Sequence, residues 1–164
     1  MNMIDPIVNE LEHEAGTTRR LLQRLPPDRL GWQPHVKSMT LGRLATHIAE
    51  IPGWVSSILE KDEVDMSGGH TPQTGKSPAE IQAVFDKSVV QATDMMKRQT
   101  PERLMAVWRL KKDGKVLLEM PRIGVIRAVL MNHLIHHRGQ LSVYLRLLDV
   151  PIPSIYGPSA DQPM

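Results

Sequence analysis

The feature that most constrains this chain is a helical spacing of apolar residues that recurs in four long stretches. An α-helix turns once in about 3.6 residues, so apolar residues three or four positions apart lie on one face. Each such face has to be buried against another element. The expected helices span residues 5–25, 40–60, 78–99 and 122–148. Helices of this kind predict an all-α fold, a four-helix bundle.

Local signals mark the ends of the first and third helices. Asp5 can cap the first helix, and Pro6 suits its first turn. The proline pair at 26–27 then stops it. Ser77 begins a capping-box sequence, with a proline after it and Glu80 three residues later, which opens the third helix.

The second helix contains a proline, Pro52, inside its apolar pattern. Proline removes one backbone hydrogen bond and clashes with the carbonyl group four residues earlier. We therefore expect a kink beside His47, or a helix that ends there and restarts.

Residues 104–120 change from a helical to an extended pattern. Asp113 and Gly114 are a strong turn signal between two short runs, 107–110 and 116–120. An isolated hairpin is marginal in water, so this one has to lie against the helices. The expected fold is thus a bundle with a small β-hairpin insertion before the last helix, while the polar residues 61–76 form a loop.

The remaining organisation is simple, because we find no repeat and no boundary between domains. Residues 1–164 are expected to form a single domain. The tail, residues 151–164, is rich in proline, glycine and serine and is expected to be extended. It also contains Tyr156, so we expect it to dock onto the bundle.

Composition excludes several classes of function. The chain has no cysteine, which excludes disulfides, thiolate metal sites and a cysteine nucleophile. A net charge of +2, with no run of five like charges and only 4% aromatic residues, argues against nucleic-acid binding. No apolar run is long enough to span a membrane, and the first residues do not resemble a signal peptide. We therefore expect a cytoplasmic protein with no nucleic-acid or membrane partner.

Histidines carry the strongest chemical signal. His133 and His137 are four residues apart, which places both imidazoles on one face of a helix, where they can bind one metal ion. Residue 134 is Leu, so the glutamate that serves zinc proteases as a general base is missing. His47 is the best third ligand, because it interrupts an apolar stripe on the second helix. Three histidines and an open position are typical of catalytic metal sites.

Three further side chains could support such a site. Gln140 and Tyr144 lie close to the histidine stripe on the last helix and could orient a ligand or touch a substrate. Glu50 follows His47 by one turn and could orient an imidazole. His136 lies at the flank of the stripe.

Each of these residues also has a structural interpretation. His47, His133 and His137 could be buried histidines with ordinary hydrogen-bond partners. Trp54 and Tyr144 fit a core position. The remaining residues in question are expected at the solvated surface: His13, His35, His70, Arg43, Arg127 and Arg138.

Beyond these spacings, the sequence resembles a known family over nearly its whole length. Residues 132–146 (NHLIHHRGQLSVYLR) are similar to the final helix of the DinB/YfiT-like metalloenzymes, the DinB superfamily. Residues 46–54 (THIAEIPGW) resemble the second-helix motif of that family, and residues 150–161 resemble its tail. The position of the hairpin fits as well.

The resemblance implies a four-helix bundle, often a homodimer, with a metal site on His47, His133 and His137. It implies a divalent metal, with zinc, nickel or iron as candidates. It further implies a transferase that uses a low-molecular-weight thiol and a small-molecule substrate. Two alternatives stay open: a metal-dependent hydrolase, and a non-catalytic metal-binding protein of the stress response.

Overall fold

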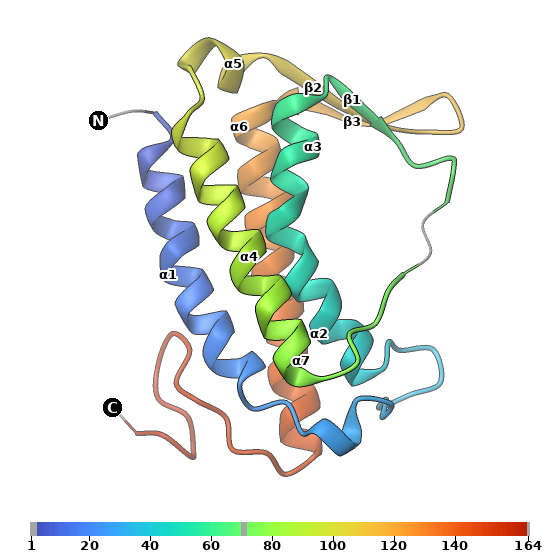
Figure 1. The fold of residues 1–164 in the computed structure, drawn as a ribbon, viewed down its shortest axis with the longest axis vertical. Helices are drawn as coiled ribbons and strands as arrows, with labels where there is room; N and C mark the ends of the chain where they lie inside the picture. Colours follow the sequence, from blue (N-terminus) through green and yellow to red (C-terminus); the bar gives the residue numbers. More distant parts are fainter. Residues whose placement is uncertain (1–2, 70–71, 164) are drawn as a thin grey trace.

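Long helical segments lie side by side along the long axis of the molecule (Figure 1). This statement concerns residues 3–69 and 72–163, which the computed structural model describes. Helices α1, α4, α2 and α7 contact one another in a closed cycle, in that order. Their bounds are Asp5–Leu22 for α1, Pro78–Lys97 for α4, Leu41–Glu50 for α2 and Asn132–Leu147 for α7. The prediction of a mostly helical chain is confirmed.

The predicted apolar faces form the core of this arrangement. On α4, buried side chains recur three or four residues apart, and Val84 lies at an exposed edge. The buried residues of this helix include Ile81, Phe85, Val89, Ala92 and Met96. At about 25 cal/mol per Å² of buried apolar area, such faces supply most of the favourable free energy of folding.

The helix boundaries follow the predicted signals with two corrections. Ser77 and Thr40 both cap, because their hydroxyl groups accept backbone N–H bonds at the starts of α4 and α2. Asp5, however, is the first residue of α1 and not its cap. The first helix also ends at Leu22, before the expected residue 25, because the last residues before the prolines close into tight turns.

The prediction of an interruption at Pro52 is confirmed in its second form. Helix α2 ends at Glu50, a 3₁₀ turn spans Ile51–Trp54 (η2), and α3 restarts at Val55–Glu60. A proline at the start of a turn needs no backbone donor, which explains why the break falls here.

The predicted hairpin is present and is part of a larger sheet. Strands β2 (Val107–Lys112) and β3 (Lys115–Pro121) pair antiparallel, and Asp113 and Gly114 have positive φ angles of 50° and 74°. Two positive φ angles are what a tight hairpin turn requires. Strand β1 (Glu63–Asp65) pairs parallel with β2. The prediction of a loop over residues 61–76 is therefore wrong for these three residues.

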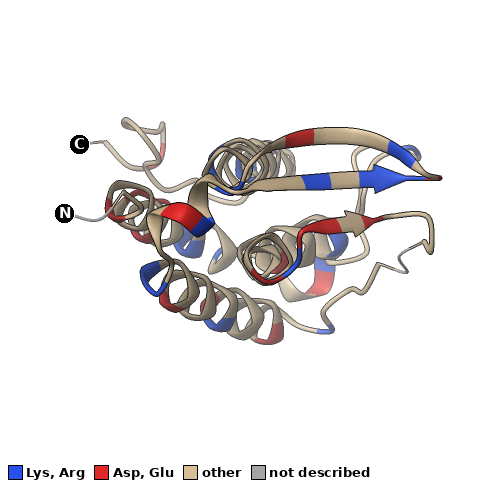
Figure 2. Cartoon of the chain, turned by 90° about the horizontal axis from the view of Figure 1, so that it is seen from above, with Lys and Arg blue, Asp and Glu red and all other residues tan. Residues whose placement is uncertain are grey.

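The sheet lies across one end of the helices and extends to the side opposite both chain termini (Figure 2). A short helix, α5 (Pro101–Met105), leads from α4 into β2 and was not predicted. Among the described residues, no helix is long and apolar enough to cross a membrane.

The last helical segment is not uniform. It begins as α6 (Arg122–Val125), widens into a π-helical turn over Ile126–Met131 (η3), and continues as α7. The sequence predicted one regular helix over residues 122–148. A π turn places more residues in each turn than an α-helix does, so it changes which side chains of the segment share a face.

A buried arginine joins the sheet to the helices. The Arg122 side chain is 0% exposed and donates to the backbone carbonyl groups of Ile58, Lys61, Ala106 and Val107 at 2.9–3.0 Å. It also contacts the Asp62 carboxylate. These acceptors lie at the end of α3 and at the start of β2, and Arg122 itself belongs to α6. One side chain therefore connects these three elements.

A second buried arginine corrects the sequence analysis. Arg138, expected at the solvated surface, is 1% exposed and pairs with Glu14 of α1. The hydroxyl group of Tyr156 lies against the same carboxylate at 3.0 Å, and Ile152 is buried. The tail therefore docks onto the helices, as predicted.

Replacing Arg122 by Met should lower the free energy of unfolding by about 3–5 kcal/mol, because buried carbonyl groups lose their donors. Arg127→Met is the matched control, since Arg127 is exposed and its ion pair with Glu10 should contribute about 0–1 kcal/mol. Urea unfolding of both variants measures the difference. Equal losses would contradict the assigned role of Arg122.

Candidate metal centre

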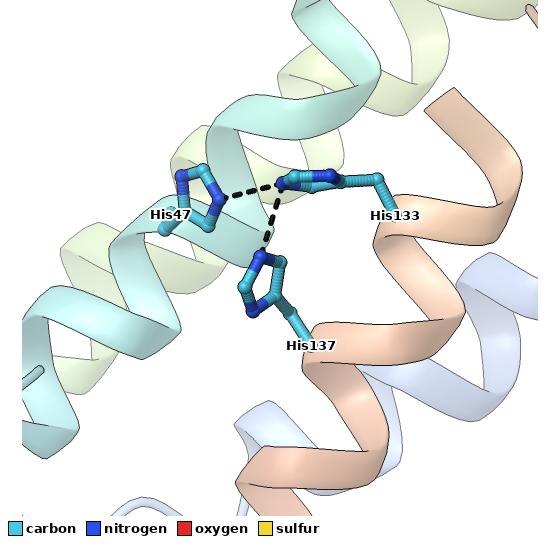
Figure 3. A group of neighbouring side chains, drawn as sticks. All are labelled: His47, His133 and His137. Carbon is cyan, nitrogen blue, oxygen red and sulfur yellow. Dashed lines mark hydrogen bonds between the residues drawn. The ribbon is translucent and has the colours of Figure 1, made fainter. Parts of the chain in front are cut away.

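The structure brings together the three histidines that the sequence singled out (Figure 3). His47 comes from α2, and His133 and His137 come from α7. The Nε2 atom of His133 lies 2.9 Å from Nε2 of His47 and 3.0 Å from Nε2 of His137. Three ring nitrogens thus converge on one point between the two helices.

Local geometry explains this convergence. On α7, a separation of four residues stacks His133 and His137 on one face. Helix α7 packs against α2, so that face meets the side of α2 that carries His47. The apolar stripe of α2, whose buried residues include Leu44 and Ile48, holds the backbone of this helix against the core.

Gln140 fixes the tautomer of one of these imidazoles. Its Oε1 atom lies 2.7 Å from Nδ1 of His137, and an amide oxygen can only accept. The proton of neutral His137 is therefore on Nδ1, and its Nε2 presents a lone pair to the centre. A second interaction that orients the ring in this way is typical of histidines that bind metals.

The proton count also fits a cation at the centre. A neutral imidazole has one N–H group, so Nε2 of His133 either donates to one neighbour or accepts from one. A metal ion among the three nitrogens would accept a lone pair from each of them.

Burial keeps His133 and His137 neutral. Burial, together with smaller contributions from the nearby His137 and His136 rings, lowers the pKa of His133 from 6.5 to about 4. Burial also lowers the pKa of His137, although the bond to Gln140 acts in the opposite direction. Unprotonated imidazole is the form that binds metals, so the site is ready to bind at neutral pH.

An aromatic side chain covers one flank of the centre. The Trp54 ring lies 5.5 Å from the His47 ring and 5.1 Å from the His133 ring, measured between centroids. The exposed ring of His136 lies 4.9 Å from that of His137 but does not join the group of converging nitrogens. His136 therefore stays at the flank, as expected.

A cavity of about 470 Å³ opens beside His47. Its walls come from the second helical segment, from strands β1 and β2 and from the π turn. Seven of its lining residues are apolar, namely Trp54, Ile58, Val64, Met66, Trp108, Leu110 and Val129. The polar lining residues are Arg43, His47, Glu50 and Ser57.

The other candidate residues lie in different places. Glu50 lines this cavity and forms an ion pair with Arg43, with 3.2 Å between Oε2 and Nη1. The Tyr144 hydroxyl donates to the Met39 carbonyl at 3.3 Å, and its ring packs edge-on against Trp32. Tyr144 thus connects α7 to the segment before α2. His13 and His35 are exposed as predicted, and His70 lies outside the described residues.

Sequence reasoning missed several parts of the cavity. Arg43, expected to be solvated, has a side chain only 16% exposed and lines the cavity. Its position one turn before His47 was a usable signal. Trp108 and Val129 carried none, because the sheet and the π turn bring them to the cavity.

Comparisons with known proteins agree with this fold. The model of the DinB family matches residues 1–163. The uncharacterized protein YrdA of Bacillus subtilis (strain 168) is 26% identical over 167 residues, covering 97% of this chain and 91% of that protein. A DinB-like protein from Bacillus cereus ATCC 10987 has a TM-score of 0.73 at 22% identity, covering 93% of this chain and 97% of its own. The DinB-like protein YjoA of Bacillus subtilis has a TM-score of 0.72 at 17% identity, covering 98% and 100%.

The low pKa of His133 predicts that the metal-free protein loses stability in acid. Below pH 6.5 the unfolded chain binds a proton that folded His133 takes up only near pH 4. Stability therefore rises with pH in this window and is lost as the pH falls. Thermal unfolding of chelator-treated protein between pH 6.5 and 4 should show this slope, and His133→Gln should flatten it. An unchanged slope in the variant would count against this assignment.

Proposed function

The chain belongs to the DinB family, and from this premise we propose that it binds one divalent metal ion through His47, His133 and His137. The observation that carries the proposal is the convergence of three Nε2 atoms, one of which Gln140 holds unprotonated. Imidazole donors suit zinc, nickel and iron. Three protein ligands leave a position free for a substrate, as in catalytic sites.

The reaction that this site supports best is the transfer of a low-molecular-weight thiol to a small electrophilic molecule. A divalent metal bound there would lower the pKa of a thiol and so favour the thiolate at neutral pH. The chain has no cysteine, so the reacting sulfur has to come from a co-substrate such as glutathione, bacillithiol or mycothiol. The sulfur forms a bond to an electrophilic carbon, the leaving group departs with its electron pair, and the thiol proton passes to solvent.

The chain's own residues would position the reactants. Gln140 holds the proton on Nδ1 of His137 and keeps that ring in one orientation. Trp54 lies over the rings of His47 and His133 and excludes water from that flank. The apolar cavity beside His47 would hold the electrophile next to the bound thiol.

A hydrolase is the second candidate, because Glu50 lines the same cavity as His47 and could act as a general base toward water. Its Oε2 atom already accepts from Nη1 of Arg43, however, so this oxygen is occupied and would first have to be released. A thiol co-substrate needs no such base, and we therefore rank thiol transfer first.

Elemental analysis of protein purified without a histidine tag tests the metal site. Wild-type protein should hold about one zinc, nickel or iron ion per chain, and His133→Ala should lose it. His136→Ala is the matched control, because His136 is exposed and its ring stays outside the group of converging nitrogens. Absence of metal from a folded wild-type protein, even after reconstitution, would leave the three residues as buried histidines without a metal role.

Activity is tested with 1-chloro-2,4-dinitrobenzene and each of the three thiols, by following the release of chloride and the absorbance of the thioether. The metal-loaded wild type and His136→Ala should accelerate the reaction, and His133→Ala should fall to the uncatalysed rate. Normal turnover by metal-free His133→Ala would refute the mechanism. Hydrolysis without thiol, with the same metal dependence, would favour the hydrolase. A protein that binds metal but accelerates neither reaction would fit a non-catalytic metal-binding role.

A further inference from the structure

The cavity beside His47 lies between two different parts of the fold. Trp54, Ile58 and Val129 contribute from the helical segments, whereas Val64 and Leu110 contribute from β1 and β2. Val64 and Leu110 are neighbours in the parallel register of these strands, so their side chains lie next to each other on one face of the sheet. This pair forms an apolar wall opposite the helices.

The charged groups that line the cavity neutralise each other. Nη1 of Arg43 lies 3.2 Å from Oε2 of Glu50 and donates to the carbonyl group of Gln73 at 2.9 Å. The two side chains are 16% and 27% exposed, so their pairing takes place away from most of the solvent. A charged group on a ligand would lose its hydration at the apolar wall without gaining an unpaired counter-charge.

Two tryptophans give the cavity fixed aromatic surfaces. The Trp108 side chain is buried, and its indole Nε1 donates to the Ser57 carbonyl at 3.2 Å. This bond uses the only donor of the indole, so the ring offers the cavity apolar surface alone. Trp54 lies tilted against the rings of His47 and His133, so a molecule that contacts Trp54 also lies beside the candidate metal centre.

We propose that this cavity binds the uncharged, apolar body of a small organic molecule, and that Val64, Leu110 and Trp108 select for it. The volume of about 470 Å³ lies within the range of sites that enclose small ligands. The inference deepens the proposed function, since it names the class of electrophile that would react there. Binding itself requires neither the metal nor a thiol, so the two proposals can fail separately.

The test compares two probes that share a naphthalene ring system by isothermal titration calorimetry at pH 7. The first, 2-naphthol, is uncharged, and the second, 2-naphthalenesulfonate, is an anion that coordinates metals poorly. The purified protein should bind 2-naphthol at least tenfold more tightly than the sulfonate. Equal or tighter binding of the sulfonate would overturn the proposal.

A matched pair of variants locates the binding site. Val64→Glu places a carboxylate in the wall and should weaken binding of 2-naphthol at least tenfold. Val116→Glu makes the same change on the exposed part of β3, outside the cavity lining, and should leave binding unchanged. Unaltered binding by Val64→Glu would overturn the assignment.

A second variant protects the test against a loss of folding. Met66 lies at the cavity rim and is 45% exposed, so Met66→Glu should be tolerated by the fold and should also weaken binding of 2-naphthol. Circular dichroism and thermal unfolding check that each variant is folded, and unaltered binding by a folded Met66→Glu would count against the proposal. Repeating the titration on chelator-treated protein separates the two proposals. If the protein binds no metal even after reconstitution but still binds 2-naphthol, this inference is supported and the proposed function is refuted.

Discussion

The rotation of α7 about its own axis is set by a buried ion pair, and the candidate centre depends on that rotation. Arg138 and Glu14 are 1% and 5% exposed and join α7 to α1, and the Tyr156 hydroxyl completes the contact. Separating two such charges inside a core costs about 3–5 kcal/mol, because each would remain buried without a partner. With this side of α7 held toward α1, His133 and His137 are turned toward α2.

The cavity depends on a different set of constraints. Arg122 ties the start of the sheet to the end of α3, and this connection holds β1 and β2 over the helices. The π turn before α7 adds Val129 to the lining. The candidate metal centre and the cavity are therefore built by separate interactions that meet at His47, which belongs to both.

The features that the sequence predicts well are those with a local cause. Apolar periodicity located the long helices, Pro52 marked the break after α2, and the Asp113–Gly114 turn located the hairpin. The three histidines also stood out, because two share a helical face and the third interrupts an apolar stripe. The features that it missed arise from tertiary contacts. Arg138 is a charged residue of a type that usually lies at the surface. It is buried here because Glu14, over a hundred residues away in the chain, neutralises it.

Strand β1 is another feature that the sequence did not predict, and it affects how the cavity behaves. It has three residues, pairs only with β2 among the described strands, and has no fully buried side chain. Free energies of local opening vary within a protein, and a short, exposed strand lies at the low end of that range. The helices that carry the histidines are thus more rigid than the β1 wall of the cavity. A guest molecule could be exchanged by local opening of this wall, on its own timescale, while the packing of the helices stays intact.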